Sequence, residues 1–222
     1  MLRGEAGSTA WGEYQALMSD PAVAAEFSRG QHAGSAGPAV ALAKQTDLAG
    51  RTRLLDVGGG SGAFTIMCCR RNPNLRATIL DFPNALDVAR EFVGDAQLAD
   101  RVEYVAANAF EEPWPEGHDV VLMSYLMSAV AGDAIGALLE RSFAALPAGG
   151  LLLVHDFMVD DELGGPTDAA MWFLTCMFNR ADARVLTPNL ISEQTTAAGF
   201  IDVEVQHLIP DLTRVITANK PR

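Results

Sequence analysis

The sequence predicts an α/β fold in which helices cover both faces of a doubly wound, mostly parallel sheet. From residue 53 onward, short apolar runs alternate with helix-like stretches, which is the pattern of repeated strand–helix–strand units. The first run ends in a glycine-rich turn, as strands often do at the carboxyl edge of a Rossmann-like sheet. A chain of 222 residues can form one such domain with a sizeable core.

The expected elements follow one another in a regular order. Strands are predicted at the short apolar runs, residues 54–57, 77–80, 102–105, 120–123, 151–154, 203–205 and 214–218. Helices are predicted between most of them, at residues 63–71, 84–92, 133–146 and 189–198. The segment around Pro210 is too short for a helix, so we expect the last two strands to form an antiparallel hairpin.

A helical segment, residues 1–50, precedes the domain expected at residues 51–222. Asp20 can cap a helix whose first turn contains the proline that follows it. The glycines and proline of residues 34–38 are expected to interrupt this helix. A second helix is then expected at residues 39–48.

Composition excludes several classes of partner. The net charge is −12, and no cluster of Lys and Arg is present to neutralise phosphates, so we expect no nucleic-acid binding. No run approaches the roughly 18 apolar residues of a membrane span, and no signal peptide is visible, so we expect a cytoplasmic protein. Cys68, Cys69 and Cys176 lack metal-ligand spacing, which favours buried thiols in a reducing compartment and no metal site.

The glycine-rich turn, within Leu54–Gly62, predicts a bound cofactor. Nicotinamide, flavin and S-adenosylmethionine sites all use such a turn, but here the spacing is D-x-G-x-G-x-G, with Asp56 two residues before Gly58. An acid at this place would repel a pyrophosphate, whereas it suits the ammonium group of S-adenosylmethionine. Asp56, Gly58 and Gly60 are therefore predicted to bind S-adenosylmethionine.

Further cofactor contacts are predicted at the ends of the next strands. Asp81 closes the second strand, where an acid can bond both ribose hydroxyls; alternatively, it caps the helix after Phe82. Asn108 can serve the exocyclic amine of adenine, and Phe110 can wall its ring, although a core aromatic is nearly as plausible a role. The remaining predicted contacts are Phe82, Ala109 and Ser124.

These residues give the chain a family resemblance. It resembles the S-adenosylmethionine-dependent class I methyltransferases, specifically the plant caffeate-type and bacterial small-molecule O-methyltransferases. The resemblance runs from about Trp11 to the C-terminus. Its motifs are Leu54–Gly62, Asp81-Phe82-Pro83, Ala145–Gly150, Leu186-Thr187 and Ala198-Gly199-Phe200.

The resemblance implies a helical N-terminal domain that mediates dimerisation and closes the acceptor pocket, and nothing in this sequence corresponds to it. We therefore expect one of three arrangements: a truncated chain, an unusually open acceptor site, or a lid supplied by a partner chain. We also expect a monomer or a weak homodimer in isolation, with apolar surface exposed on residues 11–45 and 167–180.

The resemblance also implies a catalytic histidine after the fourth strand, and Ser128 stands at that position. An unperturbed serine hydroxyl cannot accept a proton near neutral pH, so we do not expect Ser128 to be a base. His155, after the fifth strand, is the alternative candidate, because imidazole titrates near neutrality. It is equally consistent with a histidine that orients an acceptor or bonds a loop.

The acceptor pocket is expected to draw on two segments. In the family, part of the pocket comes from the N-terminal helices, which here contain His32. The rest comes from a segment that here holds Trp172, Phe173, Met177 and Phe178 at helical intervals, although such a stripe is as often core. Arg180 follows and either binds an acidic or carbonyl-bearing acceptor or lies in a solvated loop.

The sequence thus predicts methyl transfer from S-adenosylmethionine to a small-molecule acceptor. O-methylation follows from the resemblance. C- or S-methylation remains open because the usual base is replaced by Ser128. The alternative is a non-methylating or degenerate relative that retains S-adenosylmethionine as a structural or electrostatic cofactor.

Overall fold

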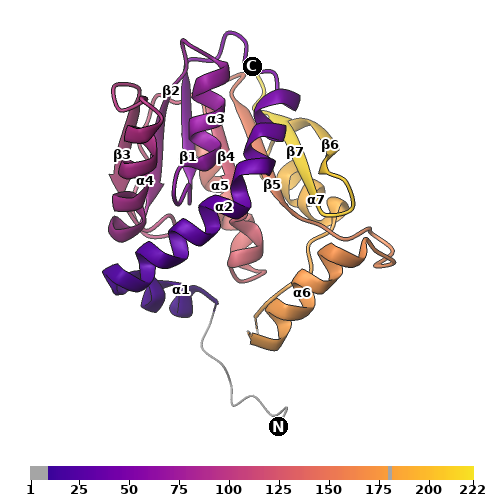
Figure 1. Ribbon diagram of the computed structural model, residues 1–222. Helices are drawn as coiled ribbons and strands as arrows, with labels where there is room; N and C mark the ends of the chain where they lie inside the picture. Colours follow the sequence, from indigo (N-terminus) through magenta and orange to yellow (C-terminus); the bar gives the residue numbers. More distant parts are fainter. Residues whose placement is uncertain (1–9, 180–181) are drawn as a thin grey trace.

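The computed structural model describes residues 10–179 and 182–222 and contains the predicted sheet. Its seven strands lie in the order β3-β2-β1-β4-β5-β7-β6. The five strands from β3 to β5 are parallel, whereas β7 runs antiparallel to both β5 and β6 (Figure 1). The doubly wound sheet and the antiparallel final hairpin are therefore confirmed.

Most strands and helices begin and end close to the predicted positions, but β6 is much longer than the strand predicted at residues 203–205. The strands are β1 Arg53–Val57, β2 Arg76–Asp81, β3 Val102–Ala106, β4 Val120–Ser124, β5 Leu151–Phe157, β6 Ile201–Ile209 and β7 Thr213–Asn219. The helices are α1 Ala10–Ser19, α2 Pro21–Gln45, α3 Ala63–Arg71, α4 Pro83–Asp95, α5 Ala134–Ala145, α6 Thr167–Asn179 and α7 Pro188–Ala197, with a short 3₁₀ turn η1 at Met127–Ala129.

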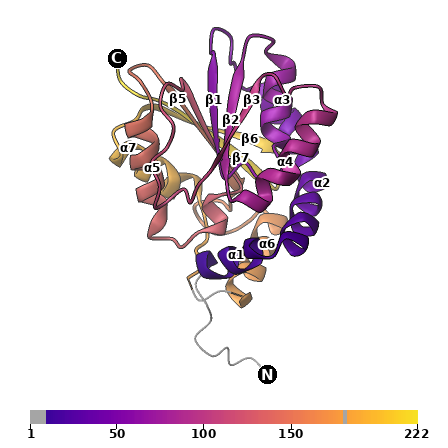
Figure 2. The same ribbon diagram turned by 90° about the vertical axis from the view of Figure 1, so that its left-hand side faces the viewer.

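Two apolar layers hold the helices against the sheet. Helices α2, α3 and α4 cover one face, and α5 and α7 cover the other (Figure 2). Strands β1, β4 and β5 are buried from both sides, which explains why their sequences are continuous apolar runs rather than alternating ones.

All five parallel strands end at the same edge of the sheet. The glycine-rich turn follows β1 there, and helices α1 and α6 also lie at this end of the molecule (Figures 1 and 2). In an α/β sheet, ligands bind beyond the carboxyl ends of the strands, next to the point where the strand order reverses. Here that point lies between β1 and β4.

The predicted interruption of the N-terminal helix at residues 34–38 is wrong. Helix α2 runs without a break through Pro38. A proline inside a helix removes one backbone hydrogen bond and costs roughly 3 kcal/mol. Packing offsets that cost: Ala39, Leu42 and Ala43 are buried against α3 and the sheet, and Asp20 caps the start of α2 by accepting from two backbone N–H groups.

Two kinds of feature are absent from the described residues. None of the helices within 10–179 and 182–222 combines the length and the apolar character needed to cross a membrane. The same residues contain no group of three or more His, Cys, Asp or Glu side chains placed to hold a metal ion.

Candidate functional site

A cavity of about 470 Å³ opens at the carboxyl edge of the sheet. This volume lies in the range of small-molecule and cofactor sites. Its lining comes from the glycine-rich turn, the ends of β2 and β4, the segment after β3, and helices α1, α2 and α6. Of the predicted site residues, Asp56, Gly58, Gly60, Asp81, Phe82, Ala109, Ser124, Ser128 and Trp172 line it.

Asp56 is a buried carboxylate with one oxygen free of protein partners. Thr65 at the start of α3 donates its hydroxyl to Oδ2 at 2.7 Å, while Oδ1 is buried with no hydrogen-bond partner. Burial raises the pKa of Asp56 to about 7, and the nearby Asp81 raises it further, against the lowering effect of Thr65. A buried oxygen without a partner at the wall of a cavity is what a cationic or N–H-bearing ligand would satisfy.

Asp81 fixes the glycine-rich turn to the end of β2. Its Oδ2 accepts from the backbone N–H of Gly60 at 2.7 Å, and its Oδ1 accepts from that of Phe82 at 2.7 Å. Burial raises the pKa of Asp81 to about 6, and these two N–H groups oppose the rise. The carboxylate thus lies beside the turn and at the cavity, with lone pairs left for a further donor.

The glycines of the turn allow a ligand to approach the backbone. Gly58, Gly60 and Gly62 have φ values of +67°, +54° and +78°, which L side chains rarely adopt. A Cβ added to Gly59 would lie 2.8 Å from Cγ of Asp56, whereas one added to Gly60 would meet no protein atom within 4 Å. The turn therefore packs tightly on its protein side and is open on its cavity side.

Of the three predicted cofactor contacts at residues 108–110, one lines the cavity and two do not. Ala109 lines the cavity, but Asn108 and Phe110 do not appear among its lining residues. Asn108 accepts from the backbone N–H of Phe110 through Oδ1, and its buried Nδ2 has no partner. As placed, the free group of Asn108 is a donor, so it would suit a ring nitrogen rather than the exocyclic amine.

His155 lies beneath the cavity instead of on its wall. Its side chain is fully buried, its Nδ1 is 2.8 Å from Oγ of Ser124, and its buried Nε2 has no partner. Desolvation lowers the pKa of His155 to about 3, so the ring is neutral at ordinary pH. This placement disfavours His155 as the proton acceptor and gives it a contact with Ser124, which does line the cavity.

Ser128 lines the cavity and is held by a buried acid that sequence reasoning missed. Its backbone N–H donates to Oδ2 of Asp156 at 2.9 Å, and its hydroxyl also bonds that carboxylate. Asp156 is fully buried and accepts further from the N–H groups of Phe157, at 2.8 Å, and Met127. Burial raises the pKa of Asp156 to about 6 despite these donors. The sequence did contain a signal for Asp156, because this residue directly follows His155, the candidate base.

Aromatic side chains form two walls of the cavity, and the wall that contains Tyr14 lies beside Phe82 and Asp81. On one wall Tyr125 packs on Phe157 with ring centroids 5.0 Å apart, and Phe157 stacks on Trp172 of α6 at 4.6 Å. On the other wall Tyr14 of α1 meets Phe27 of α2 edge to face at 6.0 Å. Most of these rings were not predicted, because their meeting depends on how α1, α2 and α6 converge on the edge of the sheet.

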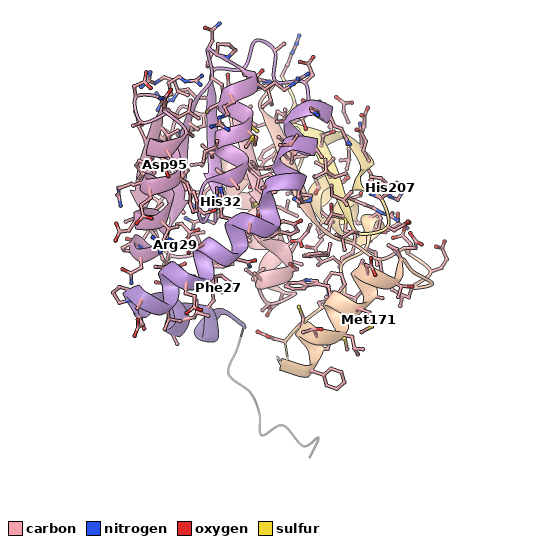
Figure 3. All side chains as sticks on the ribbon, viewed as in Figure 1. Phe27, Arg29, His32, Asp95, Met171 and His207 are labelled. Atoms are coloured by element: carbon pink, nitrogen blue, oxygen red, sulfur yellow. The ribbon has the colours of Figure 1, made fainter. Side chains whose placement is uncertain are left out.

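Two predicted acceptor residues do not line the cavity, and a third cannot be placed. His32 on α2 (Figure 3) contacts Oγ of Ser61 in the glycine-rich turn at 2.9 Å and stacks on Phe92, without lining the cavity. Met177 is 55% exposed and is not among the lining residues. Arg180 lies outside the described residues. Thr175 and Cys176, about one turn after Trp172 on α6, line the cavity instead.

Comparison with known proteins gives one family. The model of the O-methyltransferase domain family matches residues 5–201. Among curated proteins, the 3-hydroxy-5-methyl-1-naphthoate 3-O-methyltransferase of Streptomyces sahachiroi is 39% identical over 130 residues, which are 59% of this chain and 38% of that protein. The L-tyrosine C(3)-methyltransferase of Streptomyces lavendulae is 31% identical over 130 residues, 59% of this chain and 36% of that protein.

A solved structure resembles the whole chain. The S-adenosylmethionine-dependent methyltransferase SibL in its apo form superposes with a TM-score of 0.79 at 30% identity, covering 100% of this chain and 64% of SibL. The matches to the two curated relatives span less than two-fifths of their lengths.

Proposed function

Because the chain belongs to the O-methyltransferase domain family, we propose that it transfers a methyl group from S-adenosylmethionine to a small-molecule acceptor. The observation that carries this proposal is a single cavity with two unlike ends. Asp56, Asp81 and the glycine-rich turn line one end, and Ser128 and stacked aromatic rings line the other.

The cofactor end fits S-adenosylmethionine by its chemistry. The unpartnered Oδ1 of Asp56 would take the ammonium group, and Asp81 would accept from the ribose hydroxyls. The open side of Gly60 leaves room for a cofactor chain next to the backbone. When bound, S-adenosylmethionine supplies a methyl group activated by a sulfonium centre. The wall formed by Phe157 and Trp172 would exclude water from the space where the acceptor is held.

We propose a hydroxyl on an aromatic ring as the acceptor. Two features support this choice: the stacked rings of Phe157 and Trp172 offer a flat apolar wall, and the relative that is 39% identical is named as a naphthoate 3-O-methyltransferase. The chain's own contribution is to orient the acceptor against this wall with its hydroxyl at Ser128.

Carbon methylation is the second candidate. The relative that is 31% identical is named as a tyrosine C(3)-methyltransferase, so the family resemblance extends to an acceptor carbon beside a phenolic hydroxyl. A non-methylating relative that only binds the cofactor is the remaining alternative. S-methylation would need no base, but no relative described above is named for it.

Binding of S-adenosylhomocysteine tests the cofactor end. Replacing Asp81 by alanine is expected to weaken binding by about 1.5–3 kcal/mol, the scale of hydrogen bonds to a charged group. Calorimetry on the purified chain measures this loss, with thermal unfolding of the variant as a check that it still folds. Binding as tight as that of the unaltered protein would remove the cofactor assignment.

Turnover tests the reaction. The first acceptor to try is 3-hydroxy-5-methyl-1-naphthoate, because of the relative named for it. S-adenosylhomocysteine release measures transfer, and NMR of the product distinguishes a methyl ether from a methylated carbon. Tight cofactor binding without transfer to a panel of phenols, naphthols and thioethers would favour the non-methylating alternative.

A further inference from the structure

We propose that Ser128 and Asp156 act together as the proton acceptor for the methylated hydroxyl, with Ser128 passing the proton to Asp156. This inference rests on the proposed function. It assigns to a serine and a buried acid the step that the family resemblance assigns to a histidine.

The geometry joins a group that lines the cavity to one that has no exposed surface. Ser128 lines the same cavity as Tyr125 and Phe157, where the acceptor ring is expected. Behind it, the Ser128 hydroxyl bonds the carboxylate of Asp156, which has no exposed surface of its own. The carboxylate can therefore receive a proton from the cavity only through an intermediary, and Ser128 is in contact with both.

The transfer balances without another reactant. As the acceptor oxygen bonds to the incoming methyl group, its O–H bond breaks and that proton passes to Oγ of Ser128. The original hydroxyl proton of Ser128 passes at the same time to a carboxylate oxygen of Asp156. Ser128 remains a neutral alcohol, and Asp156 ends as a carboxylic acid that returns its proton to solvent after product release. The serine never becomes an alkoxide, so its high intrinsic pKa is no obstacle.

The surroundings of Asp156 suit this task. Burial raises the pKa of Asp156 to about 6. The carboxylate is therefore ionised at pH 7 and is a stronger base than an exposed aspartate. Tyr125, directly after β4, is near it: burial raises the pKa of that phenol, and the charge of Asp156 raises it further. Arg214 lies opposite Asp156 in the β5–β7 register but pairs with Asp160. His155, on the same strand, is neutral.

A purely structural role for Asp156 is the competing explanation. The carboxylate accepts from the backbone of Met127 and Ser128 and so holds the 3₁₀ turn at Met127–Ala129. Loss of activity alone cannot separate the two explanations. The experiments below therefore use readouts that depend on the proton.

The first experiment follows the Asp156 proton directly. Infrared difference spectra of the chain with S-adenosylhomocysteine bound are recorded between pH 4 and 8, and the band missing in Asp156→Asn identifies this acid. We expect it to titrate near pH 6, and at a higher pH in Ser128→Ala, because the carboxylate loses a donor. Ser128→Thr retains a hydroxyl and should titrate like the unaltered protein. A titration that Ser128→Ala leaves unchanged would overturn the proposal.

The second experiment varies the acidity of the acceptor. A naphthol and its ring-nitrated analogue, whose hydroxyl is ionised at pH 8, are compared in single-turnover methylation. Ser128→Ala should slow the naphthol by about 10²–10⁴-fold, the scale of general-base catalysis, and the nitrated analogue by less than about tenfold. Ser128→Thr should restore most of the loss. Equal losses for the two acceptors would mean that Ser128 and Asp156 act only through structure.

Failure of this proposal can be told apart from failure of the proposed function. If the unaltered chain methylates no acceptor, the proposed function fails, while the infrared titration still reports whether Ser128 and Asp156 are coupled. If the unaltered chain methylates both acceptors but Ser128→Ala lowers the methylation rate equally for each, the proposed function stands and the proposed proton transfer fails.

Discussion

Three buried carboxylates lie at one edge of the sheet, and each has a raised pKa for the same physical reason. Asp56, Asp81 and Asp156 are at most 4% exposed, and desolvation is the largest cause of the shift in each. A buried acid is costly unless donors satisfy it. Perturbed acids of this kind gather at functional sites more often than elsewhere. Here they stand at the ends of three parallel strands, around one cavity.

Two neighbouring glycines of the turn are expected to respond differently to the same substitution. Gly59→Ala puts a Cβ 2.8 Å from Asp56 and 3.0 Å from Ile79, so the unliganded protein should lose about 1–3 kcal/mol of stability through overpacking. Gly60→Ala meets no protein atom and carries only the strain of its positive φ, about 1–2 kcal/mol. Urea unfolding measures both.

Cofactor binding completes this comparison. Because Gly60 is open toward the cavity, its alanine variant should lose more affinity for S-adenosylhomocysteine than its stability loss accounts for. Gly30→Ala is a matched control, since Gly30 lies on α2 with open space around it and does not line the cavity. If the Gly60 and Gly30 variants bind equally well, the cofactor does not pass over the turn.

The sequence predicted the two acids that belong to recognisable motifs, Asp56 and Asp81. It did not predict Asp156, whose role depends on the direction in which its side chain points. Asp56 and Asp81 stand beside glycines and a proline that mark strand ends, so their location was predictable. At the end of β5, two adjacent polar residues, His155 and Asp156, point to opposite faces of the sheet. Only the register of β5 against β4, which pairs His155 with Ser124, decides which of them meets Ser128.

Among the elements, α2 joins the two ends of the site. Phe27 and Ser28 of this helix line the cavity, and its C-terminal half packs on α3 and the sheet. Its start was predictable from the capping Asp20. Its continuity was not, because local sequence at Pro38 favours a break and only tertiary packing outweighs that preference.

We expect His32 to position the glycine-rich turn from α2. Its Nδ1 lies 2.9 Å from Ser61 Oγ, and its ring stacks on Phe92 of α4 at 3.6 Å. His32→Ala removes one hydrogen bond, worth about 0.5–1.5 kcal/mol, so binding of S-adenosylhomocysteine should weaken roughly twofold to tenfold.

The histidine on β6 provides the control for this measurement. His207→Ala removes an exposed imidazole far along the chain from the turn (Figure 3) and should leave binding unchanged. Phe92→Leu retains the contact between His32 and Ser61 and should cause a smaller loss than His32→Ala. Unaltered affinity in His32→Ala would show that the turn needs no support from α2.

At the scale of the whole molecule, the alternation of strands and helices predicted a doubly wound sheet, but the order of its strands was not predicted. The exposed apolar side chains of α6 fall within the surface that was expected at residues 167–180. Met171, Leu174 and Phe178 of α6 are 55%, 44% and 66% exposed. The expectation of a monomer or weak homodimer with exposed apolar surface stays a prediction, which light scattering at micromolar concentration would test.

The stability of the unliganded protein should fall as pH rises through the pKa values of its buried acids. Asp56 titrates near pH 7 in the folded protein and near 3.8 when unfolded, so between these values the folded state binds more protons. Its contribution is therefore fully present below about pH 4 and is lost by about pH 7. Urea unfolding of the unaltered protein and Asp56→Asn at pH 5 and 8 should show a smaller decline in the variant. Parallel declines would mean that Asp56 is already ionised at pH 5.

Binding of S-adenosylhomocysteine should reverse this dependence. If Asp56 receives the ligand's ammonium group, which stays charged over this range, the complex favours the ionised carboxylate and lowers its pKa. Below pH 7 the free protein must then release a proton on binding, so affinity should rise with pH by at most about tenfold per unit and level off above pH 7. Calorimetry in buffers of different ionisation enthalpy counts the protons released.

Asp56→Asn should remove the rise in affinity between pH 6 and 7, leaving only what Asp81 contributes near pH 6. An unaltered protein whose affinity is flat from pH 5.5 to 8 would place the ammonium group elsewhere in the cavity.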